Sequence, residues 1–318
     1  MRAALVREFG ALDDLAVDEV DDPAPRWGEI LIDVVAVDVS YPDLLVVEGK
    51  YQNKPPLPFS PGKVAGGRVI SIGDGVTQFA VGDPVMAQVE FGAYAEKLCA
   101  VQEHCVRVPE GVSFQDVAAL GLAHQTAWFA LKDRASMKEG EVVLVLGASG
   151  SVGMASVQLA KALGASIVIA ATRGMGNADQ LRAMGADYVL DLTIQNLQDQ
   201  LRVEVGRCSN GHGADVVIDP VGGDAHAAAI RSMAWRGRLV VIGFASGTIP
   251  TIRANYLLVK NIAVSGLQWF DYRERMPQDV REAQSTMFSL LEEGKIKPPI
   301  KHVFDLDHAR DALTLLQE

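Results

Sequence analysis

The sequence predicts an α/β protein with a doubly wound parallel sheet, joined to a second domain that is rich in β-strands. Before residue 120, short apolar runs are broken by Gly and Pro, which predicts a small antiparallel barrel or sandwich. Farther on, apolar segments alternate with helical or loop segments, a pattern typical of a parallel sheet with helices on both faces. These six segments lie near 142–146, 166–171, 188–190, 215–218, 238–242 and 262–265.

The stretch that begins at Val142 joins a strand, a glycine-rich turn and a helix without interruption. The first five residues are apolar without alternation, as in a strand buried on both faces. The turn reads G-x-G-x-x-G with alanine at the first position, and such a turn brings the backbone close to a pyrophosphate at a helix N-terminus. We therefore predict a Rossmann-type dinucleotide site; an ordinary strand-to-helix turn is the alternative. The predicted phosphate-binding residues are Gly147, Ala148, Ser149, Gly150, Ser151, Val152 and Gly153.

Composition excludes several classes of protein. The 318 residues suffice for two domains, and 49% hydrophobic with 22% charged residues is ordinary for a globular chain. A formal net charge of −11 argues against a nucleic-acid partner, which needs clustered Lys and Arg. The three cysteines form no C-x-x-C pair. Charged residues occur too early in the sequence for a signal peptide, and no apolar run approaches the length of a membrane span. We expect a cytoplasmic protein without a membrane partner.

Two further segments complete the organisation of the chain. Between residues 113 and 137 the sequence is rich in Ala and Leu at helical spacing, which predicts a helical bridge between the domains. The last piece contains a helix through 287–291, a Pro298-Pro299 break and a final helix after Asp307. Because this piece is too short for a domain of its own, we expect it to fold back onto the first domain.

Several short sequence motifs are spread along almost the whole chain, and their order is informative. They are S-Y-P-D at 40–43, G-K-Y at 49–51, P-G-K-V-A-G-G-R-V at 61–69, G-D-P-V at 82–85, G-A-Y-A-E at 92–96, the 147–153 turn and D-P-V-G-G at 219–223. In this order they resemble the zinc-free NADPH:quinone oxidoreductase branch of the medium-chain dehydrogenase/reductase superfamily. The resemblance implies a GroES-like β-barrel catalytic domain from residues 1–120 and 267–318, and a Rossmann dinucleotide-binding domain from residues 121–266.

The phrases that hold catalytic zinc in other members of this superfamily are altered. Zinc-dependent alcohol dehydrogenases carry a cysteine in the phrase that here reads D-V-S-Y-P-D at 38–43, with Ser40 in place of the cysteine, and a His-Glu pair where this chain has Lys63 and Val64. Neither an unactivated serine nor a cationic lysine is a credible zinc ligand. We therefore expect no metal, and we expect Lys63 to be a solvated side chain.

Without a metal, the feasible chemistry is hydride delivery to an already activated double bond. The resemblance implies a quinone as acceptor; an enone or a 2-enoyl thioester is the alternative, and a non-catalytic NADPH-binding protein, as among crystallin relatives, is another. The tyrosine of a Gly-x-Tyr phrase lies near the nicotinamide in the resembling branch, so Tyr51 is a candidate to donate a hydrogen bond or a proton to the developing enolate. The alternative is that Tyr51 only lines the substrate cleft and takes no part in the chemistry. Tyr41 is a second candidate, and the lone His124 is expected to be structural.

The end of the second strand predicts the choice of cofactor. An NAD site places Asp or Glu about 20 residues after the glycines, but no acid occurs here before Asp179. Thr172 and Arg173 can instead bind a 2′-phosphate, which predicts NADPH. The resemblance implies further cofactor contacts at Ser40, Thr126, Val221, Gly222, Gly243, Phe244 and Gly266.

The last predicted strand, near residues 262–265, indicates how copies of the protein assemble. It should lie at the sheet edge in a 3-2-1-4-5-6 order, where an apolar strand is an aggregation hazard unless it is paired. Members of the resembling family cover this edge by joining two sheets across a two-fold axis. We therefore expect a homodimer with Leu257, Leu258 and Leu267 near the seam.

Overall fold

The computed structural model describes residues 1–317 and divides the chain into two compact units. The first unit consists of Met1–Leu122, Arg275–Phe288 and the chain from Pro298 on; the second consists of Ala123–Glu274 and Ser289–Lys297. The segment after Pro298 thus joins the N-terminal unit, where Arg2 donates hydrogen bonds to the Asp307 carboxylate at 3.1 and 3.2 Å. Within residues 1–317 no helix is both long enough and apolar enough to cross a membrane.

The second unit is built on a six-stranded parallel sheet in the order β10-β9-β8-β11-β12-β13, which confirms the predicted doubly wound fold. The strands are β8 (Val142–Leu146), β9 (Ile167–Thr172), β10 (Tyr188–Asp191), β11 (Ala214–Asp219), β12 (Met233–Val241) and β13 (Ala263–Gly266).

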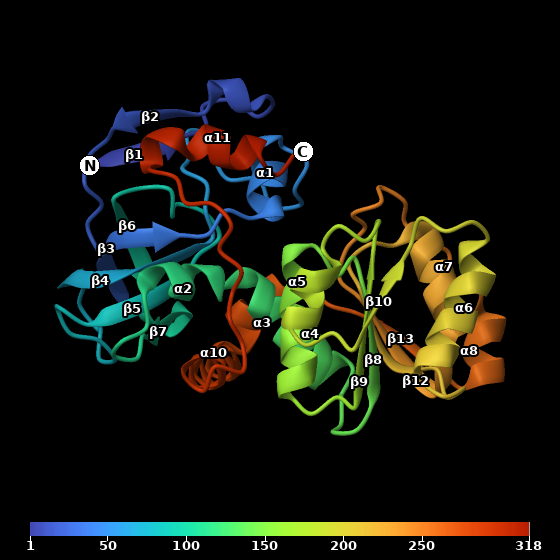
Figure 1. Cartoon of the computed structure of the whole chain (residues 1–318). Coiled ribbons are helices and arrows are strands. Elements are labelled where there is room, and N and C mark those ends of the chain that lie inside the picture. The colour runs from blue at the N-terminus through green and yellow to red at the C-terminus, as the bar shows by residue number, and fades with distance from the viewer. Residues whose placement is uncertain (318) are drawn as a thin grey trace. The chain divides into compact units, whose positions relative to one another are not determined.

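Helices cover both faces of this sheet (Figure 1). One face carries α4 (Ser151–Ala162) and α5 (Ala178–Ala183), and the opposite face carries α6 (Leu197–Cys208), α7 (Gly223–Ser232) and α8 (Ala254–Lys260). All five residues of β8 are buried. This explains the absence of alternation in its sequence, because a strand between two helical layers has no polar face.

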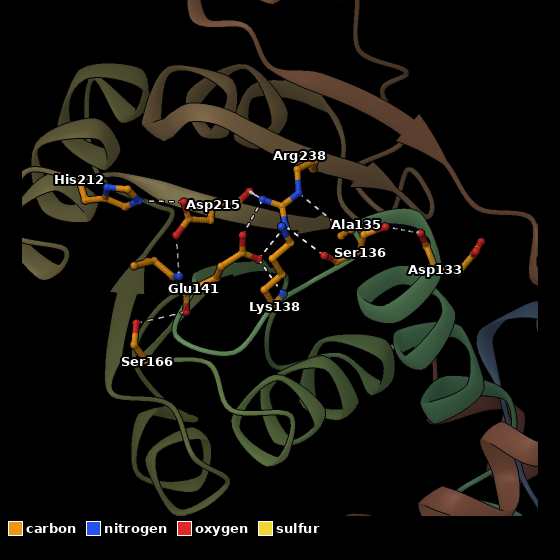
Figure 2. Close-up of polar contacts among 10 residues, drawn as sticks. Asp133, Ala135, Ser136, Lys138, Glu141, Ser166, His212, Asp215 and Arg238 are labelled. Carbon is orange, nitrogen blue, oxygen red and sulfur yellow. Dashed lines mark hydrogen bonds and ion pairs between the residues drawn. The ribbon is translucent and has the colours of Figure 1, made fainter.

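A polar network ties the amino ends of β8 and β11 together (Figure 2). Arg238 donates to both carboxylate oxygens of Glu141, at 3.0 and 2.6 Å, and to the Ala135 carbonyl at 2.9 Å. Asp215 accepts from the Val142 backbone N–H at 2.9 Å. Glu141 directly precedes β8 and Asp215 is the second residue of β11, so the network stabilises the amino end of these strands, away from the carboxyl ends that carry the predicted nucleotide site.

The first unit contains a five-stranded antiparallel sheet in the order β6-β3-β4-β5-β7, with β1 and β2 forming a separate pair. The strands are β1 (Arg2–Leu5), β2 (Ala16–Glu19), β3 (Glu29–Val37), β4 (Val64–Ile72), β5 (Pro84–Gln88), β6 (Lys97–Val101) and β7 (Cys105–Arg107). The short helix α1 (Tyr41–Val47) also belongs to this unit. Its first turn is held by a capping box of Ser40 and Asp43, which lets so short a helix begin.

The predicted helical bridge is interrupted. It comprises α2 (Phe114–Ala119), α3 (Leu122–Phe129) and a π-helical turn at Ala130–Arg134. The break falls at Gly121, where an added Cβ would lie 2.6 Å from the Val64 methyl carbons. Only glycine therefore allows this segment to approach β4. The remaining helices are α9 (Trp269–Arg275), α10 (Pro277–Glu292) and α11 (Ala309–Thr314).

Candidate dinucleotide and substrate sites

The glycine-rich turn connects β8 directly to α4. Gly147 has a φ of +58°, a conformation that glycine adopts without strain, and its carbonyl accepts from the Gly150 N–H at 3.0 Å. At Gly153 an added Cβ would lie 2.6 Å from Ala148 Cα and closer still to the Gly147 carbonyl oxygen. Helix and turn are thus packed so closely that position 153 has no room for a side chain.

The start of α4 has the properties of a phosphate site. Its first turn contains no acidic residue, and the first N–H groups of a helix lack intrahelical acceptors. At Gly150, the N-cap, an added Cβ would meet nothing closer than the Gly147 carbonyl oxygen at 3.4 Å. The protein itself therefore leaves the space above Gly150 open, and the turn fits a pyrophosphate.

The end of β9 is organised by a residue that the sequence reasoning missed. The Asp191 carboxylate, at the end of β10, accepts from the N–H groups of Thr193 and Gly174 at 2.8 and 2.9 Å, and these bonds hold its pKa below the usual range. It thereby fixes the loop that follows Arg173, whose side chain is exposed. Thr172 is buried, and its hydroxyl donates to the Ser149 hydroxyl at 2.9 Å.

The loop after β11 is fixed by a buried carboxylate. Asp219 accepts from the N–H groups of Val221 and Gly222, both at 2.9 Å, and lies 2.7 Å from Nδ1 of the buried His226. Val221 in turn packs over the glycine turn, because a Cβ on Gly147 would lie 2.7 Å from one of its methyl carbons. His226 was not singled out from the sequence, since a lone histidine in a helix gives no signal of its partner.

The carboxyl ends of the parallel strands bring several predicted residues to one edge of the sheet. Gly147 follows β8, Val221 follows β11, Gly243 follows β12, and Gly266 ends β13 in register with Val241. Phe244, beside Gly243, is 41% exposed. Thr126 lies within α3 rather than at a helix start and is buried, as is His124.

In the first unit, Ser40 belongs to the turn at the start of α1. The buried Asp43 carboxylate accepts from the Ser40 backbone N–H at 2.9 Å, from its hydroxyl at 2.6 Å and from the Tyr94 hydroxyl at 3.3 Å. Burial raises the pKa of Asp43, although these hydrogen bonds and the Lys63 ammonium oppose the rise. The Ser40 hydroxyl is therefore already engaged in supporting the turn.

Lys63 is not the solvated side chain that the sequence predicted. It is 1% exposed, and its ammonium donates to the Glu90 carbonyl oxygen at 2.7 Å and lies 3.6 Å from the Glu90 carboxylate. The same nitrogen lies 5.0 Å from the centroid of the Tyr51 ring. The prediction was wrong because residue type alone indicates exposure for lysine, whereas these acceptors and this ring come together only in the folded unit.

The two candidate tyrosines differ in environment. Tyr51 is partly buried and packs against the apolar cluster of the first unit, whereas Tyr41, the first residue of α1, is 53% exposed. Among residues 1–317, no three His, Cys, Asp or Glu side chains are grouped so that they could hold a metal ion.

Comparisons with known proteins match the chain over nearly its whole length. The alcohol dehydrogenase GroES-like domain family matches residues 26–122, and the zinc-binding dehydrogenase family matches residues 151–285. Quinone oxidoreductase-like protein 2 of Mus musculus is 36% identical over 311 residues, which are 98% of this chain and 87% of the mouse protein. A mycobacterial quinone oxidoreductase superposes with a TM-score of 0.92 at 30% identity, covering 100% of this chain and 96% of its own. The Escherichia coli quinone oxidoreductase complexed with NADPH has a TM-score of 0.87 at 26% identity, with coverages of 100% and 96%.

Proposed function

We infer the function from the family: the chain belongs to the medium-chain dehydrogenase/reductase superfamily, in its quinone oxidoreductase branch. Its first unit carries the GroES-like antiparallel sheet and its second the Rossmann sheet of that superfamily. We propose that the protein is an NADPH-dependent reductase that works without zinc and transfers hydride to a quinone. The observation that carries this proposal is the Gly147–Gly153 turn, which fits a dinucleotide pyrophosphate at the start of α4.

The proposed preference for NADPH rests on the end of β9. The exposed Arg173 guanidinium can pair with a 2′-phosphate. The buried Thr172 contributes through its hydrogen bond to Ser149 rather than by direct contact, which refines the expectation for that residue. The related Escherichia coli enzyme was crystallised with NADPH, which supports the same preference.

In the proposed reaction each unit has its own task. The second unit would hold the dinucleotide, and Val221, Gly222, Gly243, Phe244 and Gly266 are the residues proposed to contact its nicotinamide end. The bound nicotinamide supplies a hydride. In the first unit the proposed catalytic residues are Tyr51 and, as a second candidate, Tyr41, with Tyr51 as the group that hydrogen-bonds the carbonyl oxygen of the acceptor.

One observation favours a second candidate, the reduction of an enone or an enoyl thioester. Such a substrate must gain a proton at carbon after the hydride arrives, whereas a reduced quinone takes its protons from water. Tyr51 lies beside the buried Lys63 ammonium, an environment suited to a proton donor. NADPH and the glycine turn keep the same roles in this candidate.

We also propose that the protein is a cytoplasmic homodimer. β13 lies at the sheet edge, and next to it in sequence α8 exposes Leu258 and Val259, which are 79% and 76% exposed. Two copies that pair these edges would cover both. Leu267, by contrast, is 8% exposed and already packed within its own unit, so a direct role in the seam is not proposed for it. Sedimentation as a monomer at micromolar concentration would refute this assembly.

A panel of acceptors tests the proposed function. The wild-type protein is assayed with NADPH and, in turn, benzoquinone, naphthoquinone, a simple enone and crotonyl thioester, and its metal content is measured. We expect quinone reduction without stoichiometric zinc. Turnover of thioesters alone would favour the second candidate, and tight NADPH binding without turnover of any acceptor would identify a non-catalytic binding protein.

A further inference from the structure

The first unit holds four ionisable groups close together, and the quinone reduction proposed above uses none of them. Asp43, Tyr94 and the cation Lys63 are buried, and the partly exposed Asp38 lies beside them. Burying a lysine is costly unless its charge is compensated. The compensation here comes from the Glu90 carbonyl oxygen at 2.7 Å and from the surrounding carboxylates.

The two aspartates near Lys63 are affected in different ways by burial and by hydrogen bonds. Burial, reinforced by the Asp43 carboxylate, raises the pKa of Asp38 well above its usual range. Asp43 accepts three hydrogen bonds, from Ser40 and Tyr94, which favour its charged form. The Lys63 ammonium thus has the Asp43 and Glu90 carboxylates as its counter-charges.

The neighbour on which Lys63 acts is Tyr51. The ammonium lies 5.0 Å from the centroid of the Tyr51 ring, within the range of an attractive cation–π contact. The hydrogen bond to the Glu90 carbonyl oxygen fixes the end of the lysine side chain, so the contact does not depend on a mobile group. Because Lys63 is only 1% exposed, it acts through Tyr51 rather than on the substrate directly.

We propose that Lys63 is a positioning residue for Tyr51, whose ring it holds in place and whose phenolate it stabilises after Tyr51 has given its proton to the substrate. This proposal rests on the second candidate of the proposed function, the reduction of an enone or an enoyl thioester, in which the substrate must gain a proton. When hydride adds to the acceptor, an electron pair moves onto the carbonyl oxygen. The Tyr51 O–H bond breaks as the proton passes to the substrate, and water then restores the proton to the phenolate. The buried cation lowers the energy of that phenolate by electrostatic attraction.

The first experiment follows the ionisation of Tyr51 by ultraviolet difference absorbance in the cofactor-free protein. The chain has six tyrosines, so Tyr51→Phe identifies the signal. Lys63→Gln keeps a donor for the Glu90 carbonyl oxygen and removes the charge, whereas Lys63→Arg keeps the charge. We expect Lys63→Gln to move the ionisation upward by about one pH unit or more, and Lys63→Arg to leave it within about half a unit. An unchanged titration in Lys63→Gln would overturn the proposal.

The second experiment is a double-mutant cycle in kcat with NADPH and a simple enone. Lys63→Gln should lower kcat about tenfold in the wild-type background and have no further effect in the Tyr51→Phe background, with the KM for NADPH unchanged. Equal losses in both backgrounds would show a merely structural role. If Lys63→Gln alone unfolds the protein, the same comparison is made with the double variant Lys63→Gln/Asp43→Asn, in which the opposing charge is removed as well.

The two proposals fail in different ways. A wild-type protein that turns over no acceptor contradicts the reductase function, and the tyrosine titration still decides whether Lys63 acts on Tyr51. An active wild-type protein whose Lys63→Gln variant keeps full kcat contradicts only the role of Lys63.

Discussion

Replacing Gly153 by alanine tests whether close packing of α4 on the glycine turn is required for folding. The new Cβ would lie 2.6 Å from Ala148 Cα, and the Gly147 carbonyl oxygen is nearer still. Carbon atoms pack at roughly 3.5 to 4.0 Å, so helix and turn must separate by about 1 Å. Both colliding groups belong to the backbone, and no side chain can rotate away.

The change in the free energy of unfolding can be estimated from these short distances. Overpacking of this kind costs about 1 to 3 kcal/mol or more, while alanine gains about 1 kcal/mol over glycine in a helix. We expect a net loss of about 2 kcal/mol in the free energy of unfolding, which corresponds to a fall in Tm of roughly 4 to 8 °C. The measurement is urea and thermal unfolding of the cofactor-free protein, followed by circular dichroism.

A matched control separates packing from helix propensity. Gly206 lies inside α6 with no heavy atom within 4 Å of an added Cβ. Gly206→Ala should therefore stabilise the protein by about 0.5 to 1 kcal/mol. If Gly153→Ala matched the wild type within about 0.5 kcal/mol, or if both variants changed stability in the same direction, the reasoning about the turn would be refuted.

Other variants test the remaining contacts. Gly150→Ala should leave stability within about 0.5 kcal/mol yet weaken NADPH binding at least about tenfold by fluorescence titration, because its Cβ enters space that the protein leaves open for the phosphate. Arg173→Ala should weaken NADPH binding about tenfold and leave NADH binding unchanged; an equal loss for both would contradict a 2′-phosphate contact. Arg238→Met should cost about 2 kcal/mol in denaturant unfolding, since it leaves the Glu141 carboxylate with the Lys138 N–H but without its cation, whereas Arg182→Met, which breaks an exposed ion pair, should cost less than about 0.5 kcal/mol. Burial raises the pKa of Cys99 to about 11, so its reaction with a disulfide reagent should accelerate about tenfold per pH unit from about pH 7 to about pH 10; a plateau near neutral pH would contradict this.

The sequence by itself determined the parallel sheet and the glycine turn. Val142–Leu146 carries no polar position, and this pattern is stable only between two helical layers, so the strand could be assigned without coordinates. The turn could be assigned for a similar reason. Its glycines are needed for local geometry and for packing between segments adjacent in the chain, as the clash at Gly153 shows.

Only the tertiary structure decided the environments of the charged side chains. Lys63 and Tyr51 are separated along the chain by a loop that includes Pro55 and Pro56, and their contact depends on how that loop returns to β4. Asp219 and His226 likewise meet because α7 turns back along β11. Local patterns report which face of a strand or helix is apolar. They do not indicate which distant acceptor compensates a buried charge, because the electrostatic energy of that interaction depends on distances set by the whole fold.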